Sequence, residues 1–374
     1  MLLHIQSLNT YLATNYHLLI SHSSLLYQQF LNQILTSKQA IKHSHGKDAM
    51  TVELKSLEDN GTWSIVPLPP NCHVVGCKWV YKVKLNANGN VERSKARLVA
   101  KGYNQIKGFD YQDTFNLVAR QTTVRVFFAL AVVHNWHLSQ LDVNNAFLNG
   151  ELAEDVYMEL PQGYVINGEC PSHSRLVCKL HKSLYGLKQV SRVWNSKLTT
   201  SLQKFGFKQS NSDYSLFTMK TYNGDFIALL VYVDDILIAS NSVQVKSDVK
   251  EFLKLEFKLK ELGKVKYFLG LEIARSPEDI SICQRKYALD LLEEQGLLGA
   301  KLVSTPIDSN HKLAKSNDED KLTDATSYRQ LVGKLLYLTF SRPDIAYAVQ
   351  TAIGQDALTP KSQLQATTSS LVIP

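Results

Sequence analysis

The sequence is poor in cysteine and has no long hydrophobic run. Five of its 374 residues are cysteine, and this odd, low number argues against a secreted disulfide framework and favours a reducing compartment. No stretch reaches the ~18 consecutive apolar residues of a membrane span. The amino-terminal stretch lacks the basic start and small-residue cleavage site of a signal peptide. These absences predict a cytoplasmic or nuclear chain with no membrane partner.

A recognisable zinc module is also lacking. Cys170, His173, Cys178 and His181 are residue types that bind zinc, but their spacing fits none of the common zinc modules. Ordinary loop and strand residues are therefore the favoured interpretation of this segment. The sequence shows no internal repeat.

What is present is a globular composition with a basic excess. Hydrophobic residues make up 44% of the chain and charged residues 20%, which suits a protein that buries a core. The length fits two or three domains. The net charge of +7 weakly favours a polyanionic partner, provided that the basic residues cluster.

The basic residues do cluster, in a predicted hairpin over residues 79–99. Two alternating stretches flank Asn88-Gly89, a turn signal. The strand period of two places Arg93, Lys95 and Arg97 on one face. Against the single acid Glu92, residues 78–101 contain seven basic residues: Lys78, Lys82, Lys84, Arg93, Lys95, Arg97 and Lys101. A solvated strand face is the alternative, but the clustering favours phosphate binding.

The rest of the chain mixes helices and strands irregularly. Hydrophobic periodicity predicts helices, which we place at 48–59, 122–136, 191–207, 247–262 and 284–299. The helix at 122–136 is expected to be buried, and 266–274 is expected to be a strand. Gly296 is expected to stop the last of these helices. Such irregular alternation indicates an α+β fold rather than a doubly wound sheet.

One apolar stretch, LLVYVDDILIAS at 229–240, carries two adjacent carboxylates at its centre. Burying ionised groups without a partner is costly. A tight hairpin resolves the conflict, because its turn lifts Asp234 and Asp235 to the end of two buried strands. Adjacent acids repel, so one pKa should rise unless a cation is shared. Mg²⁺ binds carboxylate oxygens together with phosphates and water.

A second acidic strand end strengthens the case for a metal site. Asp142 lies in LDVNNAF, after an apolar helix and strand. If the two strands are neighbours, Asp142 and the acidic pair could hold two Mg²⁺ ions ~3.5–4 Å apart, the geometry of in-line phosphoryl transfer. Aspartates that only cap turns are the alternative.

Several motifs, in order, resemble one family. QLDVNNAFLNG, SLYGLKQVSRVW, LLVYVDD and KYFLGLEIA are similar to four successive motifs of the copia-type LTR-retrotransposon reverse transcriptase. GCKWVYKVK, KARLVAKGYNQ and LVGKLLYLTFSRPDIAYAVQ extend the resemblance, which covers roughly residues 10–370. It implies an RNA-directed DNA polymerase that adds deoxynucleotides to a primer 3′-hydroxyl.

The family implies a right-hand fold of fingers, palm and thumb, in which the palm is an antiparallel sheet with helices. Boundaries drawn by matching motifs give a tether (1–48), fingers (49–122 and 151–190), palm (123–150 and 191–275), thumb (276–325) and a truncated start of the connection region (326–374). The implied cofactor is a pair of Mg²⁺ ions, with Mn²⁺ as a substitute. The implied partners are an RNA template, a DNA or RNA primer and dNTPs, in the cytoplasm within a virus-like particle or in the nucleus.

The resemblance also assigns site residues. Asp142, Asp234 and Asp235 match the catalytic, metal-binding carboxylates. The residues matched to nucleotide binding are Phe147 as an aromatic gate against ribose, Ala146, Tyr185, Gly186, Lys188, Lys84 and Arg97. Template binding falls to Lys82, Lys95 and Lys101, and the primer grip to Phe268, Leu269 and Gly270. Lys82 and Lys95 are also the alternatives to Lys84 and Arg97 for binding the triphosphate.

Two other functions remain open from the sequence. The chain carries no RNase H, protease or integrase motif, which suggests a reading frame cut from a larger element. A catalytically inactive relic or a co-opted nucleic-acid-binding protein is therefore the alternative. A two-metal nuclease is a weaker one, because it would have no use for the aromatic gate. Nothing in the sequence indicates an oligomeric state.

Overall fold

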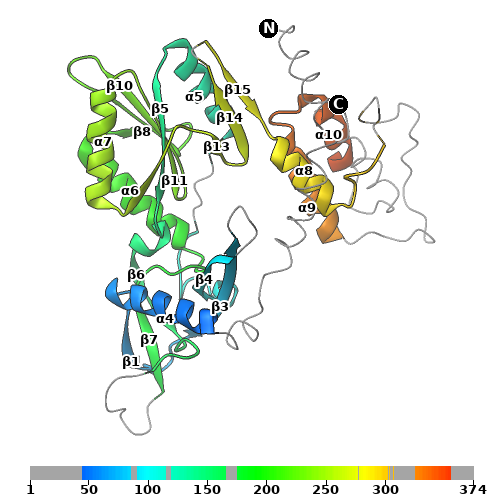
Figure 1. The fold of residues 1–374 in the computed structure, drawn as a ribbon. Helices are drawn as coiled ribbons and strands as arrows, with labels where there is room; N and C mark the ends of the chain where they lie inside the picture. Colours follow the sequence, from blue (N-terminus) through cyan, green and yellow to red (C-terminus); the bar gives the residue numbers. More distant parts are fainter. Residues whose placement is uncertain are drawn as a thin grey trace. The chain divides into compact units, whose positions relative to one another are not determined.

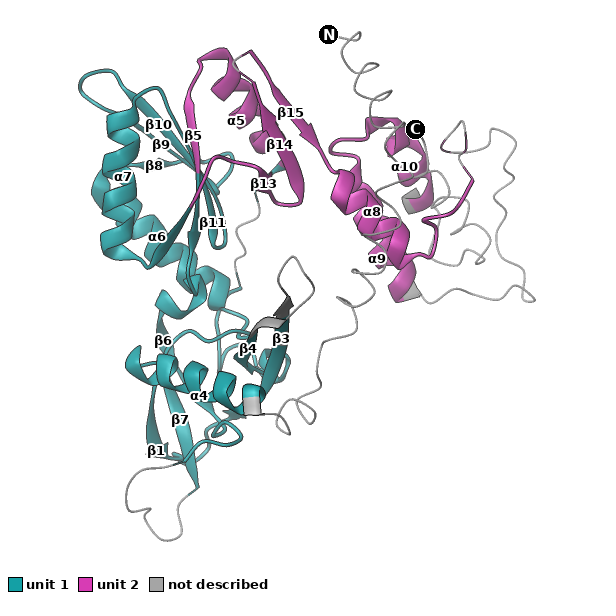
Figure 2. Ribbon diagram, viewed as in Figure 1, with its two compact units in different colours: residues 1–120, 140–261 teal, residues 121–139, 262–374 magenta. Residues whose placement is uncertain are grey.

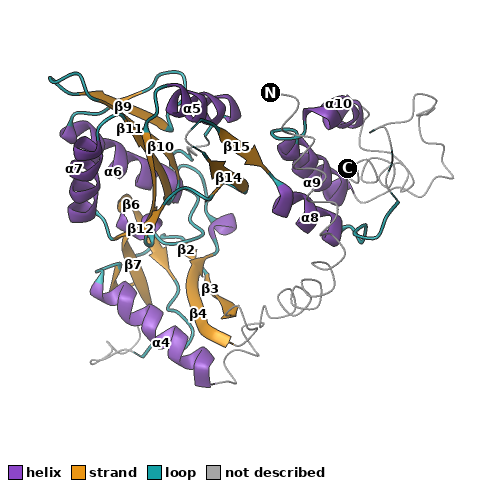
Figure 3. Ribbon diagram, turned by 45° about the horizontal axis from the view of Figure 1, so that its top comes forward, coloured by secondary structure: helices purple, strands orange, loops and turns teal. Residues whose placement is uncertain are grey.

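The computed structural model describes residues 44–85, 91–114, 119–165, 175–276, 278–301, 303, 306 and 325–354. The chain divides into two compact units, drawn in different colours in Figure 2. Unit 1 comprises residues 1–120 and 140–261, and unit 2 comprises residues 121–139 and 262–374. The predicted α+β class is confirmed, because helices and antiparallel sheets occur in both units (Figure 3).

A six-stranded sheet forms the centre of unit 1. Its order is β12-β5-β11-β10-β9-β8, and its strands are β5 (His137–Val143), β8 (Lys208–Gln209), β9 (Leu216–Lys220), β10 (Phe226–Tyr232), β11 (Asp235–Ser240) and β12 (Leu259–Gly263). Helices α6 (Val190–Phe205) and α7 (Val243–Glu256) supply Trp194, Leu198 and Leu253 to the same hydrophobic core as alternate residues of these strands. Figure 1 shows both helices beside the sheet.

The remaining part of unit 1 has its own core. A four-stranded sheet of order β1-β7-β6-β2 contains β1 (Trp63–Pro67), β2 (Val74–Val75), β6 (Glu151–Met158) and β7 (Leu176–Lys182). The hairpin of β3 (Cys77–Leu85) and β4 (Val91–Ala100) packs against helix α4 (Ser44–Asp59). Short 3₁₀ turns are η1 (Gly102–Asn104) and η2 (Ala146–Asn149). Leu57, Trp79 and Leu98 lie in the shared core.

Unit 2 combines a small sheet with helices. The sheet has the order β13-β14-β15, with β13 (Tyr267–Phe268), β14 (Leu271–Arg275) and β15 (Ile280–Cys283). The helical elements are α5 (Gln121–Val133), α8 (Arg285–Glu294), α9 (Ala325–Leu338), η3 (Pro343–Ile345) and α10 (Ala346–Gly354). Leu291, Leu335 and Val349 belong to the core between the last helices. Among the described residues, no helix is long and apolar enough to cross a membrane.

Most predicted elements form, with three corrections. The predicted helix at 247–262 ends at Glu256, because Phe257 is extended and the chain continues into β12. The predicted strand at 266–274 is two strands joined by a turn. The helix predicted at 122–136 is buried on one face only, since Val126 and Val133 are 56% and 75% exposed.

Candidate active site

The two adjacent aspartates lie at the end of the hairpin formed by β10 and β11, as the sequence predicted. Tyr232 pairs with Asp235, so Val233 and Asp234 form a two-residue turn. The strand residues that lead into the turn are buried: Ile227, Ala228, Leu229, Leu230 and Val231 on one side, and Ile236, Leu237, Ile238 and Ala239 on the other. The apolar arms therefore fix the turn while Asp234 stays exposed.

Val233 has a backbone φ of +55°. A β-branched residue in this left-handed region is a genuine outlier, and such conformations cost on the order of 1–3 kcal/mol unless the surroundings enforce them. The turn is therefore strained at the residue directly before the first carboxylate of the pair.

The third aspartate is brought to the same place by strand pairing. β5 is the neighbour of β11 in the sheet, and the Val143 amide donates a hydrogen bond of 2.8 Å to the Asp234 carbonyl oxygen. Asp142, directly before Val143, thus lies beside the turn. The predicted convergence of the two acidic strand ends is supported by this pairing.

Electrostatics also indicate that the carboxylates lie close together. Partial burial raises the pKa of Asp234, and repulsion by Asp142 raises it further, while Arg97 opposes the rise. Burial likewise raises the pKa of Asp235, with added repulsion from Asp234 and Asp142. The Gln140 side-chain amide opposes this by donating a 3.1 Å hydrogen bond to Asp235 Oδ1. Crowded carboxylates of this kind favour a shared cation.

The donor set fits a hard divalent ion only in part. Carboxylate oxygens are the ligands that Mg²⁺ prefers, and it usually takes one or two of them together with water and substrate phosphates. Within the described part of the chain, no three His, Cys, Asp or Glu side chains are already gathered as a complete metal centre. The aspartates can therefore supply part of a coordination shell that a bound nucleotide would complete.

An aromatic cluster lies next to the carboxylates. The Phe147 and Tyr185 rings meet edge to face at 5.8 Å, and the Arg97 guanidinium lies 4.6 Å from the centre of the Tyr185 ring. The charges of Asp234 and Asp142 raise the pKa of Tyr185 after the larger effect of its burial. The structure thus brings three predicted nucleotide-binding residues to the carboxylates. Ala146 is buried in the core behind Phe147.

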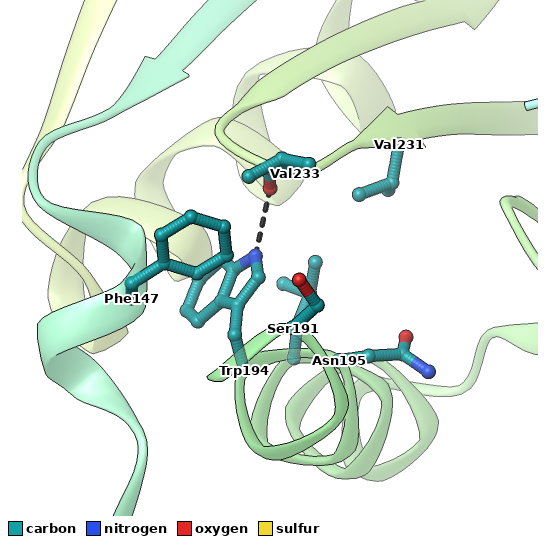
Figure 4. A pocket seen from close by; sticks show the side chains of 7 residues that line it. Phe147, Ser191, Trp194, Asn195, Val231 and Val233 are labelled. Atoms are coloured by element: carbon teal, nitrogen blue, oxygen red, sulfur yellow. Dashed lines mark hydrogen bonds between the residues drawn. The ribbon is translucent and has the colours of Figure 1, made fainter. Parts of the chain in front are cut away.

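Phe147 also borders a small pocket beneath the turn. The pocket is lined by Phe147, Ser191, Trp194, Asn195, Leu198, Val231 and Val233. In Figure 4, the indole of Trp194 points from its helix toward the Val233 carbonyl oxygen. The distance from Trp194 Nε1 to that oxygen is 2.7 Å.

Gly186 permits close backbone approach, but the observed partner is the chain itself. The Ala100 amide donates to the Tyr185 carbonyl oxygen at 2.7 Å. A Cβ at Gly186 would lie 2.2 Å from the Ala100 carbonyl oxygen, so only glycine fits without a shift. This contact fixes the Tyr185 segment against strand β4.

The described contacts of Lys188 and Lys101 are not with the aspartates. Lys188 Nζ lies 5.2 Å from the centre of the Tyr111 ring. The Lys101 side chain runs past Gly76, where a Cβ would lie 3.0 Å from Lys101 Cδ. The described contacts of these two lysines are therefore with unit 1 loops rather than with the aspartates.

The basic hairpin keeps one register from Cys77 to Lys84, and the register shifts between Lys84 and Leu85. Lys82 pairs with Lys95, Lys84 with Arg93, and Val80 with Arg97. Directly paired residues share a face of an antiparallel hairpin, and this face therefore carries the positions Lys78, Lys82, Lys84, Arg93, Lys95 and Arg97. The opposite face supplies Trp79, Tyr81, Ala96 and Leu98 to the core. The predicted turn at Asn88-Gly89 lies outside the described residues.

The predicted primer-grip residues form a second tight turn, in unit 2. Leu269 and Gly270 have φ values of +51° and +74° between β13 and β14. Phe268 is 1% exposed, whereas Tyr267 is 57% exposed. Phe268 therefore supports the hairpin from the core, and Tyr267 is the side chain on its surface.

Sequence reasoning missed Gln140, which is buried and donates to Asp235 Oδ1. Its signal was available, because Gln140 and Asp142 lie on one face of β5 by the strand period of two. The buried Gln189 was also missed. Its side-chain amide donates to the Asp110 carbonyl oxygen at 2.9 Å and accepts from Gln105 at 3.1 Å. No local pattern signals this long-range network.

Of the four zinc-ligand candidates, Cys170 and His173 lie outside the described residues. Burial, together with Cys77, raises the pKa of the Cys178 thiol to about 12. His181 Nε2 lies 2.9 Å from Ser64 Oγ. A protonated, buried thiol is a poor metal ligand, and these contacts agree with ordinary strand residues.

Comparison with known proteins identifies the family. The profile described as "Reverse transcriptase (RNA-dependent DNA polymerase)" matches residues 60–309. The match covers more than half of the chain, and the chain therefore belongs to this family, in its copia-type retrotransposon branch.

The relatives include polyproteins of plant retrotransposons. The chain is 44% identical over 84% of its length to the "Retrovirus-related Pol polyprotein from transposon RE1" of Arabidopsis thaliana, covering 21% of that protein. It is 38% identical over 80% of its length to the corresponding polyprotein from transposon TNT 1-94 of Nicotiana tabacum, covering 23% of it. The chain therefore spans about a fifth of the length of these relatives.

A solved telomerase from Candida tropicalis is a much more distant match. It covers 65% of this chain and 60% of its own, at 11% identity and a TM-score of 0.34. This likeness is too weak to inform the site.

Proposed function

We propose that this chain is an RNA-directed DNA polymerase that extends a primer with deoxynucleotides. The observation that carries the proposal is the convergence of Asp142 with the Asp234–Asp235 turn through the pairing of β5 with β11. The Arg97, Tyr185 and Phe147 side chains lie next to these carboxylates. A site with acids on one side and an aromatic–cation pair on the other suits a nucleoside triphosphate.

Asp142 and Asp234 are the residues that would hold two Mg²⁺ ions, with Mn²⁺ as a substitute, and Asp235 would assist. When bound, the ions lower the pKa of the primer 3′-hydroxyl and stabilise the negative charge that develops on the phosphates. The raised pKa values of Asp234 and Asp235 describe carboxylates that repel one another until cations join them. Gln140 fixes the orientation of Asp235.

The aromatic cluster would select and hold the nucleotide. The primer 3′-hydroxyl would release its proton to water, its oxygen would bond to the α-phosphorus of the dNTP, and the bond to the leaving pyrophosphate would break. Arg97, which stacks on Tyr185, would pair with the triphosphate. The Phe147 ring would lie under the incoming sugar and exclude a 2′-hydroxyl. Lys84, with the same face of the basic hairpin, would add to the phosphate contacts.

The same proposal assigns the binding partners and the subdomains of the polymerase. An RNA template would follow the basic face that includes Lys82 and Lys95, and the primer would contact the Leu269–Gly270 hairpin. The hairpin β3–β4 with α4 would belong to the fingers, the six-stranded sheet to the palm, and α8 to the thumb. In the cell, the protein would act in the cytoplasm, within a particle, or in the nucleus.

The direct test is extension of oligo(dT) on poly(rA) with Mg²⁺ by the full chain. Asp234→Asn should abolish incorporation, because it removes a metal-binding charge without changing the size of the side chain. Asp225→Asn is the matched control, since Asp225 lies directly before β10 at the far end of the same hairpin. An active Asp234→Asn protein would overturn the assignment. Salt-dependent nucleic-acid binding with no incorporation by the wild type would instead support a non-enzymatic binding protein.

A further inference from the structure

The indole N–H of Trp194 makes a contact that neither the family match nor the sequence assigns. Trp194 lies in α6 and is 2% exposed. Its Nε1 donates a 2.7 Å hydrogen bond to the carbonyl oxygen of Val233, 39 residues away and inside the turn that carries Asp234. Figure 4 shows this bond at the edge of the pocket beneath the turn.

The accepting carbonyl belongs to the strained residue of the hairpin. Val233 has a φ of +55°, and it lies outside the ladder, which ends at the pair Tyr232–Asp235. A carbonyl in such a turn gains no partner from the strands, so the indole satisfies a group that would otherwise be left unpaired. Because valine resists positive φ, the turn needs an external restraint to stay in this conformation.

The rest of the Trp194 side chain is held firmly. Its ring meets Phe257 edge to face at 5.2 Å, and it packs in the core that includes Leu198 and Val231. Packing alone would be satisfied by any large aromatic ring. Donation to the turn carbonyl also requires a polar hydrogen on the ring, which phenylalanine lacks, so the N–H of tryptophan has a role beyond filling space.

We propose that Trp194 is a positioning residue that fixes the strained Val233 turn and thereby sets the orientation of Asp234. The inference rests on the polymerase function proposed above and deepens it. Loss of the bond should let the turn relax toward unstrained φ values. Misplacement of a reacting group by about 1 Å can cost ~100-fold in rate, so a partial relaxation should lower kcat more than it changes KM.

The test compares Trp194→Phe with Trp79→Phe in the full chain. Phenylalanine keeps a buried aromatic ring and removes only the N–H and one ring. Trp79, which lies in β3, makes the same kind of bond, from its Nε1 to the Gln162 carbonyl oxygen at 3.1 Å. Trp194→Phe should lower kcat about tenfold with KM for dNTP within about twofold, whereas Trp79→Phe should leave kcat within about twofold. Equal kcat losses in the two variants, or no loss in Trp194→Phe, would overturn the proposal.

A second substitution tests whether Trp194 acts through the strained backbone of Val233. Val233→Gly removes the penalty for positive φ, so the turn should depend less on its restraint. Trp194→Phe should then cost only about two- to threefold in kcat when introduced into Val233→Gly. If the two effects simply multiply, Trp194 does not act through the Val233 conformation.

A readout without nucleotide separates this inference from the polymerase assignment. Hydrogen exchange followed by mass spectrometry should show peptides covering residues 229–240 exchanging about fivefold faster in Trp194→Phe and unchanged in Trp79→Phe. If the wild type incorporates no nucleotide but the exchange differs in this way, the polymerase function fails and the restraint stands. Unchanged exchange in an active enzyme would mean that the restraint fails and the polymerase function stands.

Discussion

Two hairpins of the molecule hold a strained turn with the same kind of hydrogen bond, but their strands differ in length. In each, a non-glycine residue at the turn has positive φ: Val233 between β10 and β11, and Leu269 between β13 and β14. In each, the carbonyl oxygen of that residue accepts a hydrogen bond from a distant aromatic side chain, Trp194 Nε1 in the first case and the Tyr337 hydroxyl in the second. Each of the two turns is thus held by its own aromatic donor, which lies on a helix.

The two hairpins differ in how much support their own strands give to the turn. β10 and β11 have long, buried arms in a six-stranded sheet, and their turn carries charge. β13 has only two residues, and its turn ends in Gly270, which adopts positive φ freely. The carboxylate turn is therefore a rigid support with strain at one bulky residue, whereas the second turn depends more on the helix that donates to it.

The largest effect is expected from Asp142, which lies on β5 beside the first hairpin. Its substitution should remove the activity without unfolding the chain. Asp142→Asn should reduce incorporation at least 1,000-fold, because it removes a charge that we propose to bind metal, and about 4 kcal/mol of barrier corresponds to that factor. The free energy of unfolding should not fall, because repulsion of Asp234 is relieved. Primer extension and thermal melting would check both. A variant that melts much earlier than the wild type would show that Asp142 is structural.

The second prediction concerns pH and metal. The pKa values of Asp234 and Asp235 are raised in the folded chain, so the folded state binds more protons than the unfolded state above the ordinary carboxyl range. Their contribution to stability therefore falls as the pH rises through that window. Mg²⁺ should reverse the loss, and millimolar Mg²⁺ should raise Tm more near neutral pH than at about pH 5.

The control for this metal effect is Asp234→Asn. It should reduce the Mg²⁺-dependent rise in Tm at neutral pH, while Leu269→Asn in the other hairpin should leave it unchanged. A rise in Tm that is the same at both pH values and in both variants would mean that Mg²⁺ does not bind at the carboxylate turn.

A smaller effect is expected from the donor to the second turn. Tyr337→Phe removes the hydroxyl that donates to Leu269 and keeps the ring, which meets Tyr287 edge to face at 5.2 Å. The lost bond should lower the free energy of unfolding by about 1 kcal/mol, measured by urea denaturation. Incorporation of a single nucleotide should fall less than in Trp194→Phe. A larger kcat loss than that of Trp194→Phe would reverse the proposed ranking of the two hairpins.

The smallest effect is expected from a substitution at the turn of the second hairpin. Leu269→Asn places a residue that tolerates positive φ at the turn, in exchange for the loss of a half-buried leucine side chain. Stability should change by no more than about 0.5 kcal/mol. A large destabilisation would show that the leucine side chain, rather than the backbone conformation, holds the second hairpin.

Local patterns predicted the elements that local physics controls. The apolar stretches on both sides of the acidic pair indicated the β10–β11 hairpin, and the strand period indicated the basic face of β3 and β4, both of which form. The pattern failed after Glu256. There, LEFKLKEL has helical periodicity, but Phe257 is buried and extended and Asn144 donates to the Lys258 carbonyl oxygen. Pairing with a distant strand overrode the local preference.

The family motifs and the spacing of the acids were sufficient to single out Asp142, Asp234 and Asp235 as candidate metal ligands, with turn capping as the alternative. The sequence alone thus determined which class of chemistry to propose. Only the tertiary structure decided which side chains support those carboxylates. Gln140 and Trp194 act through hydrogen bonds to residues 95 and 39 positions away, and such contacts exist only after the strands and α6 have packed together.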